Sequence, residues 1–441
     1  ANALDLPVDR VRVKSAVIGG AFGGKEDSSL AILAALGAWK IRGSFKLVNT
    51  RRESFLAHPK RHPAQITYKL GATEDGTITA LKATTHMDTG AYASYGPAVA
   101  MILTETLAGS YRVKNIQLDT YLVYTNSPLS GAMRGFGSPQ SHFAVESTLD
   151  MLAEKVKLDP IQIREKNILH PGDELFTRVK MSNSALALEQ CLSEGRKIMA
   201  EYQALESGAG KKVGVGIALA AQSMGLGANI PDDSSHKLEW APDGTILIHL
   251  GSPDLGQGLA AAAEQITAEA LGIPYDQVLC LPLDTLDTPN GNVTCASRMT
   301  YMAGNALLDA STKLIQGLLD GAGRLLDIKP ENLKYEAGKV IKPDGAELPA
   351  VEFISRLAEE SIQLTAESTF SFPYPEDSTP QHLPIGMPHV LDCFGAQIAR
   401  VEVDPELGAV EVTHFTAIHD VGKVINQQGV EGQIEGGVAT G

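Results

Sequence analysis

The sequence has 441 residues, which is enough chain for two or three domains with large hydrophobic cores. Hydrophobic residues make up 44% and charged residues 20%, so a globally disordered protein is excluded. The formal net charge is −15, which disfavours nucleic acid and membrane surfaces as partners because both are negatively charged. The four cysteines form no CxxC or Cys/His cluster, so we expect no zinc or iron–sulfur site within these residues. Because the cysteines are few and scattered, we also expect a protein of the reducing cytoplasm.

The predicted elements begin with a strand over 11–18, a glycine-rich loop, and an apolar helix over 28–40 with Asp27 as its N-cap. Three hairpins follow, which pair 65–70 with 77–86, 236–240 with 245–250, and 397–403 with 409–418. Further helices are predicted over 141–156, 184–205, 258–271 and 302–326, and near the end of the chain. Hairpins mixed with helices indicate an α+β fold rather than a doubly wound sheet.

A linker is predicted at Ser207–Gly210, where small residues precede two lysines. It divides the chain into residues 1–206 and 213–441, and each part contains hairpins, helices and glycine-rich loops. The chain begins with Ala1 and stops at Gly441 inside a helical pattern. We therefore expect a fragment of a longer polypeptide, truncated at both ends.

The loop from Gly19 to Lys25 has the GxxxxGK spacing of a phosphate-binding loop, between a predicted strand and a predicted helix. Glu26 stands where that motif needs Ser or Thr to hold Mg²⁺, and its charge would repel phosphate. A nucleotide-dependent thermal shift would reveal a triphosphatase. The loop amides could also bind another anion or an oxo group at the helix N-terminus, and a plain strand-to-helix turn is the simplest alternative.

Four more loops of glycine or small residues stand at or near predicted helices, namely Gly131–Gln140, Leu255–Gly258, Thr294–Ser297 and Gly432–Gly437. Each alone is also explained by packing or by an ordinary helix start. Together, five such loops are what a large polar cofactor needs if backbone and side-chain amides hold it without protein–metal bonds. Cys295 has no evident base partner in the sequence, and His58, His62 and His86 lack metal-ligand spacing.

The order of these motifs resembles that of the molybdopterin-binding large subunit of the xanthine dehydrogenase and aldehyde oxidase family, which includes bacterial hypoxanthine and xanthine oxidases. The resemblance rests on Gly19–Glu26, Arg61–Pro63, Ala132–Gln140, Gly256–Gly258, Thr294–Ser297, Asp420–Gly422 and Gly432–Gly437. It implies two elongated α+β domains, 1–206 and a truncated 213–441, that clasp a molybdenum–molybdopterin cofactor. The cytosine dinucleotide form of the cofactor is one alternative, and no protein ligand to the metal is expected.

The resemblance also assigns residues to the cofactor. Phe22 and Gly23 match backbone donors beside a molybdenum oxo ligand, and Arg134 matches an arginine whose main chain approaches the metal. The remaining matches are Gly256 and Gln257 for the pterin, Cys295, Ala296 and Ser297 for the pterin phosphate, and Gln433 for a position near the metal.

For the substrate, the resemblance assigns Phe136 to packing against a flat ring and Glu26 to binding a purine. It implies hydroxylation of an N-heterocycle such as hypoxanthine or xanthine, with water as the oxygen source. Electrons would leave through 2Fe-2S clusters, with flavin as a further module. These redox groups would lie in missing segments of the polypeptide or in partner subunits. The complete enzyme would form a dimer of assemblies. The 101–106 segment lacks the arginine with which animal-type enzymes orient xanthine.

The catalytic general-base glutamate of the family lies in a Gly-Glu-Pro motif that does not occur in this sequence, so we expect the isolated chain to be inactive. Two alternatives remain beside the purine hydroxylase. One is an oxidoreductase of the same family that acts on aldehydes or other N-heterocycles. The other is a non-catalytic cofactor-binding or scaffold protein that retains the fold.

Overall fold

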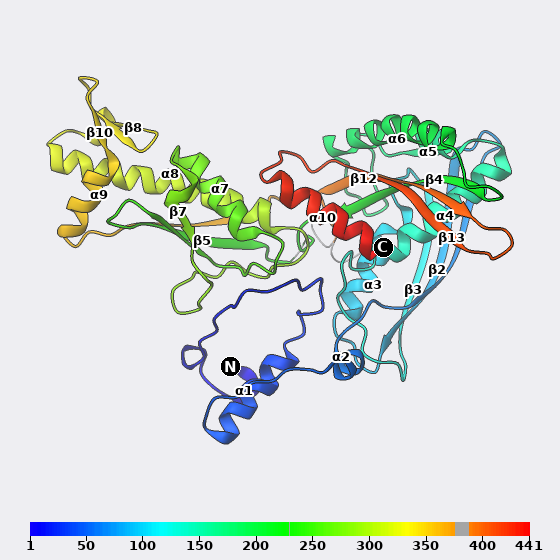
Figure 1. Cartoon of the computed structure of the whole chain (residues 1–441), viewed down its shortest axis with the longest axis horizontal. Coiled ribbons are helices and arrows are strands. Elements are labelled where there is room, and N and C mark those ends of the chain that lie inside the picture. Colours follow the sequence, from blue (N-terminus) through cyan, green and yellow to red (C-terminus); the bar gives the residue numbers. More distant parts are fainter. Residues whose placement is uncertain (229, 375–387) are drawn as a thin grey trace. The chain divides into compact units, whose positions relative to one another are not determined.

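A computed structural model of the chain describes residues 1–228, 230–374 and 388–441 (Figure 1). The chain divides into two compact units, each made of three segments. Unit 1 comprises Ala1–Ala21, Pro231–Pro373 and Lys423–Gln433, and unit 2 comprises Phe22–Ile230, Tyr374–Gly422 and Ile434–Gly441. These units follow spatial contacts, whereas the predicted division at 207–212 follows the sequence and stays a prediction. No helix in the described ranges has the length and apolar character of a membrane span.

Unit 1 is built on a four-stranded sheet with the order β11-β5-β6-β7. Its strands are β5 (Asp233–Trp240), β6 (Ile246–Leu250), β7 (Val278–Cys280) and β11 (Leu364–Ser371). The predicted hairpin of β5 and β6 is confirmed, with Trp240 opposite Ile246. Its turn is stabilised by the carboxylate of Asp243, which accepts a hydrogen bond from Thr245 N at 3.0 Å.

Unit 1 also contains the helices α7 (Leu259–Leu271), α8 (Met299–Leu326) and α9 (Ala350–Glu359), and the first part of α10 (Gln427–Thr440). A small sheet is formed by β8 (Lys334–Glu336), β9 (Lys339–Ile341) and β10 (Glu347–Pro349). Helix α8 buries Leu307, Leu314 and Leu318 in one core with Leu238 and Ile248 of the sheet. Full burial of each such side chain contributes about 1.5–3 kcal/mol. This core fixes the N-terminal ends of α7 and α8, where two of the predicted cofactor loops lie.

Unit 2 contains two three-stranded sheets, with the orders β1-β2-β3 and β13-β12-β4. The strands are β1 (Ala64–Ala72), β2 (Ile78–Gly90), β3 (Asn115–Tyr124), β4 (Lys212–Ser223), β12 (Asp392–Val403) and β13 (Val410–His419). The hairpins β1–β2 and β12–β13 confirm two predictions. The parallel pairing of β2 with β3 was not predicted, because no turn joins the two strands.

The helices of unit 2 are α1 (Ser29–Ile41), α2 (Arg51–Ala57), α3 (Gly96–Glu105), α4 (Ser138–Val156), α5 (Pro160–Asn167), α6 (Leu186–Ala204) and the end of α10. One core joins α4 and α6 to β4 and β12, through residues such as Leu149, Leu188 and Ile398. A second core packs Leu103 of α3 with Met87 of β2. The predicted helices are therefore present, while α2, α3, α5 and α9 were missed.

Two predictions near the N-terminus are wrong. Residues 11–18 form no strand but only an isolated bridge between Lys14 and Asp284, with Ser15 N donating to Leu283 O at 2.9 Å. Asp27 does not cap α1, whose N-cap is Ser28 without a side-chain hydrogen bond. The carboxylate of Asp27 instead accepts a hydrogen bond from Ser94 Oγ at 2.7 Å, so a tertiary partner replaces the local one.

Candidate functional site

Two predicted cofactor loops are in direct contact within unit 2. The backbone N–H of Arg134 donates to Phe22 O at 2.9 Å. Gly23 has φ of +96°, and a Cβ there would lie 2.7 Å from the carbonyl carbon and oxygen of Ala132. Glycine is therefore required at position 23 on two counts, conformation and space. The structure brings the Phe22–Gly23 and Ala132–Arg134 backbones together, a contact that was not predicted from the sequence.

Arg61 supports this pair of loops. Its Nη2 donates to the carbonyl oxygen of Arg134 at 2.8 Å. Its Nη1 is buried and has no hydrogen-bond partner among the described residues. Both arginines line a groove in unit 2, together with Gln140, whose Nε2 donates to His62 O at 3.1 Å. Arg61 belongs to one of the motifs that carry the family resemblance, but its contact with Arg134 was not predicted from the sequence.

The last part of α10 also reaches this loop. A Cβ on Gly436 or Gly437 would lie 3.5 Å from a guanidinium nitrogen of Arg134. The absence of side chains at these two positions gives the Arg134 side chain room beside the helix. Within unit 2, Gly436 and Gly437 therefore account for the glycines at the end of the Gly432–Gly437 motif.

Glu26 and Phe136, the predicted substrate residues, also belong to unit 2. Burial, and then the charge of Asp27, raises the pKa of Glu26 to about 7. That carboxyl group can therefore exchange a proton near neutral pH. Phe136 is half-buried and packs against the α3 core, with its ring 6.3 Å from the ring of Tyr95 in an edge-on arrangement.

In unit 1, the loop of Gly256 and Gln257 forms the start of α7. The carboxylate of Asp254 accepts hydrogen bonds from Gly256 N at 2.8 Å, Gly258 N at 3.3 Å and Ala260 N at 3.0 Å. These amides are thus satisfied within the chain and are not left for a phosphate. Asp254 was missed, although an Asp shortly before a helix start is an ordinary capping signal.

The side-chain amide of Gln257 is oriented by its own loop. Its Oε1 accepts a hydrogen bond from Leu255 N at 2.7 Å, and a backbone N–H can only donate, so the assignment of the amide oxygen is fixed. The Nε2 group is buried and has no hydrogen-bond partner in the described part of the chain. An unmatched buried donor costs about 1–3 kcal/mol, which an acceptor on a bound pterin would offset. This residue therefore fits the predicted cofactor.

The Cys295, Ala296 and Ser297 segment lies beside the Gln257 loop, because Thr294 Oγ1 donates to Pro253 O at 2.8 Å. Ala296 and Ser297 both have left-handed backbone, with φ of +53° and +50°. Phe22 and Phe136 share this conformation, with φ of +54° and +49°. Non-glycine residues held in this way are strained and concentrate at functional sites.

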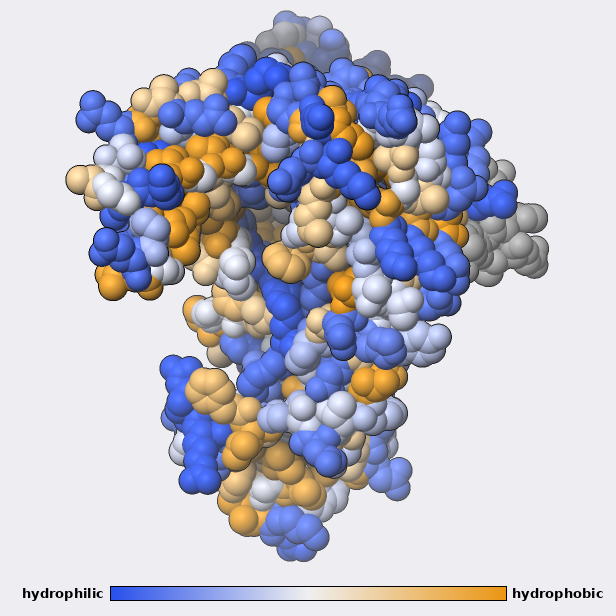
Figure 2. All heavy atoms as spheres, turned by 90° about the vertical axis from the view of Figure 1, so that its right-hand side faces the viewer, coloured by the Kyte–Doolittle hydropathy of each residue, from blue (hydrophilic) through white to orange (hydrophobic). Residues whose placement is uncertain are grey.

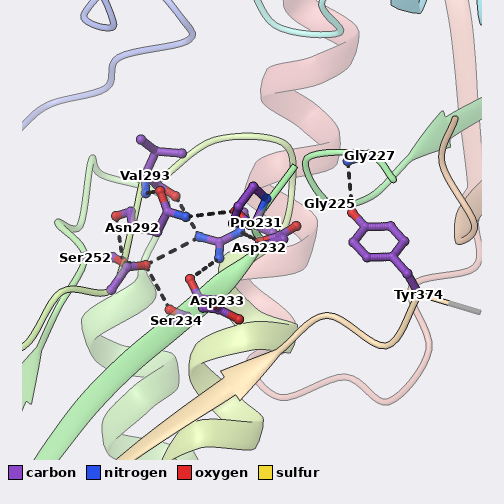
Figure 3. Close-up of polar contacts among 12 residues, drawn as sticks. Gly225, Gly227, Pro231, Asp232, Asp233, Ser234, Ser252, Asn292, Val293 and Tyr374 are labelled. Carbon is purple, nitrogen blue, oxygen red and sulfur yellow. Dashed lines mark hydrogen bonds and ion pairs between the residues drawn. The ribbon is translucent and has the colours of Figure 1, made fainter. Parts of the chain in front are cut away.

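A buried ion pair anchors the segment that precedes α8, and Figure 3 labels its acid, Asp232, with the neighbouring Asp233 and Val293. Arg298 Nε donates to Asp232 Oδ1 at 2.6 Å, and both side chains are fully buried. Its Nη1 also donates to Val293 O at 2.9 Å, and its Nη2 to Asp233 O at 2.8 Å. Arg298 thereby fixes the loop that leads into the predicted cofactor residues. Sequence reasoning missed it, although it directly follows the Thr294–Ser297 motif.

Gln433 lies on α10 and is the last residue of unit 1. In that unit the residue before α10 is bonded to α7, since Asn426 Nδ2 donates to Gln265 Oε1 at 3.0 Å. The predicted residues are thus divided between the units: Gly256, Gln257, Cys295–Ser297 and Gln433 belong to unit 1, and the others belong to unit 2. Among the residues the structure describes, no cluster of His, Cys, Asp and Glu could hold a metal ion.

Comparisons with known proteins identify the family of this chain. Two family profiles, each described as a molybdopterin cofactor-binding domain, match residues 1–168 and 187–441. The chain belongs to the xanthine dehydrogenase and aldehyde oxidase family. It is 34% identical to a probable xanthine dehydrogenase subunit of Bacillus subtilis, over 100% of this chain and 58% of that protein. It is 32% identical to a putative xanthine dehydrogenase molybdenum-binding subunit of Escherichia coli, with the same coverage.

Among solved structures, the aldehyde oxidoreductase of Desulfovibrio gigas matches with a TM-score of 0.84 and 28% identity, over 99% of this chain and 45% of that one. The mixed α+β fold of a molybdenum hydroxylase large subunit is thereby confirmed. The chain spans little more than half the length of the curated relatives it matches. The roles of the individual site residues stay predictions.

Proposed function

We propose that this chain is the cofactor-binding part of a molybdenum hydroxylase that acts on an N-heterocycle, a purine such as hypoxanthine or xanthine. The observation that carries the choice of substrate is Glu26, a half-buried carboxyl group whose pKa is raised to about 7, three residues after Gly23. The names of the Bacillus and Escherichia relatives support the same substrate class.

The cofactor, as molybdopterin or its cytosine dinucleotide form, would supply the oxygen transfer and the two-electron oxidation when bound. Gln257 presents its Nε2 donor, while Asp254 and Arg298 hold the loops on either side of it. Phe22, Gly23 and the Arg134 backbone form the second group of contacts. The Cys295–Ser297 segment and Gln433 complete the set.

Glu26 would bind the heterocycle and exchange a proton with a ring nitrogen or carbonyl oxygen. Because its pKa is about 7, the protonated and ionised forms are both populated at neutral pH. Phe136 would pack against the flat ring, where an offset arrangement of aromatic faces is favourable. We further propose that electrons leave through 2Fe-2S and flavin modules outside these residues, in a dimer of assemblies.

An aldehyde is the second candidate substrate, because the aldehyde oxidoreductase of Desulfovibrio gigas matches nearly the whole chain with a TM-score of 0.84. A neutral carboxyl group at position 26 is not needed to bind an aldehyde carbonyl, which lacks a titrating ring nitrogen. The two candidates therefore differ in how strongly activity depends on Glu26.

The test is Glu26→Gln in the enzyme assembled with its redox partners. We expect kcat/KM for hypoxanthine to fall by about 10²-fold, as for loss of a general acid–base group, while an aldehyde loses less than about twofold. Glu53→Gln, an exposed acid that caps α2, is the matched control. An unchanged kcat/KM for hypoxanthine would contradict the purine assignment.

A second test concerns the cofactor alone. Gln257→Glu keeps the acceptor for Leu255 N and removes the Nε2 donor, so we expect a lower molybdenum content per chain with the fold unchanged. Elemental analysis measures this without any activity assay. Full molybdenum content in the variant would exclude Gln257 from the cofactor site.

A further inference from the structure

Helix α1 exposes all of its large hydrophobic side chains. None of its residues is buried, although most of them are apolar. The exposed large side chains are Leu30, Ile32, Leu33, Leu36, Trp39 and Ile41. Five more lie between residues 45 and 56. Such a concentration in fewer than thirty residues far exceeds the scattered apolar residues of an ordinary surface.

The apolar residues of α1 lie on opposite sides of the helix. At about 100° per residue, the nine steps from Leu30 to Trp39 turn the helix by about 900°, which places the two side chains about 180° apart. Both are exposed, at 39% and 51%. A helix that covers one face of a protein has a single apolar stripe, whereas a helix that is apolar all round is enclosed in a core. Figure 2, which keeps the vertical axis of Figure 1, shows hydrophobic side chains on the surface of the lowest part of the molecule, where Figure 1 places α1.

The charge around α1 also differs from that of the whole chain. Residues 29–57 contain five basic side chains and one acidic side chain, in a protein of net charge −15. The basic residues are Lys40, Arg42, Lys46, Arg51 and Arg52. A partner segment with apolar residues at its centre and acidic residues at its edge would complement this surface.

We propose that α1 is a core helix of the whole large subunit, enclosed by polypeptide that corresponds to the part of the relatives outside the span of this chain. The Bacillus relative has such polypeptide, because the match covers 58% of its length. A second copy of this chain in a two-fold contact would cover one side of α1, and a membrane surface would also contact one side. Further polypeptide wrapped around the helix accounts for both apolar sides. This inference does not depend on the substrate.

The test adds that polypeptide, expressed separately, to the 441-residue chain and follows α1. Trp39 is exposed and Trp240 is 4% exposed, so acrylamide quenching reports mainly on Trp39. We expect quenching to fall at least threefold and hydrogen exchange in 29–41 to slow by at least tenfold. Leu33→Asp, at a side chain 53% exposed, should abolish both changes. Leu407→Asp, at an 81% exposed turn residue, should leave them intact as the matched control.

Because Leu33 is exposed, Leu33→Asp should keep the thermal unfolding midpoint of the unaltered chain. If that midpoint falls, Ile41→Asp repeats the test at another exposed side chain of α1. No protection of α1 by the added polypeptide would overturn the proposal. So would equal protection when the chain alone is concentrated, which indicates a second copy. Equal protection with phosphatidylserine vesicles would overturn it in favour of a membrane surface.

Discussion

The two groups of predicted cofactor residues are held in place by different physical means. In unit 1, buried or capping charges fix the loops, through Arg298 with Asp232 and through Asp254 at the start of α7. In unit 2, the backbones of two loops pack directly on each other, which the lack of a side chain at Gly23 permits. The loops of unit 1 therefore depend on ion pairs and capping hydrogen bonds, whereas the loops of unit 2 depend on the absence of a side chain at Gly23. The two should respond differently to substitution.

The largest effect is expected for Arg298→Ala. It leaves the buried carboxylate of Asp232 without its ion-pair partner, which costs about 3–5 kcal/mol of unfolding free energy. Urea unfolding followed by Trp240, which lies in the core of unit 1, measures this. Arg324→Ala, near the end of α8, removes an exposed ion pair with Glu360 and should cost at most about 1 kcal/mol. Equal losses for the two variants would contradict the anchoring role.

A smaller effect is expected in unit 2 for Gly23→Ala. The new Cβ would lie 2.7 Å from the Ala132 backbone, which cannot rotate away, so the overpacking adds about 1–3 kcal/mol. Gly210→Ala is the control, because Gly210 also has positive φ, at +77°, but has open space around its Cβ position. The difference between the two variants isolates the clash. Hydrogen exchange in 130–136 should increase only in the Gly23 variant.

The pH dependence of stability gives a third effect. The folded-state pKa of Glu26 is raised to about 7, above its unfolded value, so folding favours the protonated form. Its contribution is present below about pH 4.5 and is lost as pH rises through 7, by roughly 1 kcal/mol after solvent screening. Glu26→Gln should remove that loss between pH 5 and 8 in chemical unfolding. Glu53→Gln should not, because hydrogen bonds from Thr50 lower the pKa of Glu53.

A further effect on stability is expected for Gln257→Glu, at about 1–3 kcal/mol, because the hydrogen bond from Leu255 N is kept but a carboxylate oxygen replaces the buried Nε2 group. The same variant should lose cofactor. Thermal unfolding of the cofactor-free chain checks the first statement, and molybdenum content checks the second. A large loss of stability would show that the amide is structural.

Local signals in the sequence predicted much of this fold. Turn residues such as Pro242–Gly244 lie between alternating strands, so the hairpins follow from neighbouring residues alone. The pairing of β2 with β3 depends on a crossover through α3, and no short-range pattern specifies it. The strand predicted over 11–18 failed for a similar reason, because its alternation had no long partner strand.

The candidate site was predicted by motif order, not by local physics. The glycine loops indicated close backbone approach, and Gly23 against Ala132 shows it within unit 2. The residues that fix those loops were missed, because Asp232 lies 66 positions from Arg298 and Arg61 lies 73 from Arg134. Such pairings arise only when distant segments meet in the folded chain.

The division of each unit into three segments has a consequence for how the chain is made. Ser15 bonds with Leu283 in unit 1, so the N-terminal segment cannot complete its contacts until more than 200 further residues have left the ribosome. At 5–20 residues per second this delay is on the order of 10–50 s. Throughout that time Gly20, whose backbone N–H donates to Leu255 O in the folded chain, lacks this partner. We therefore expect folding of the chain to depend on chaperones during its synthesis. We do not expect the complete chain to refold slowly for this reason.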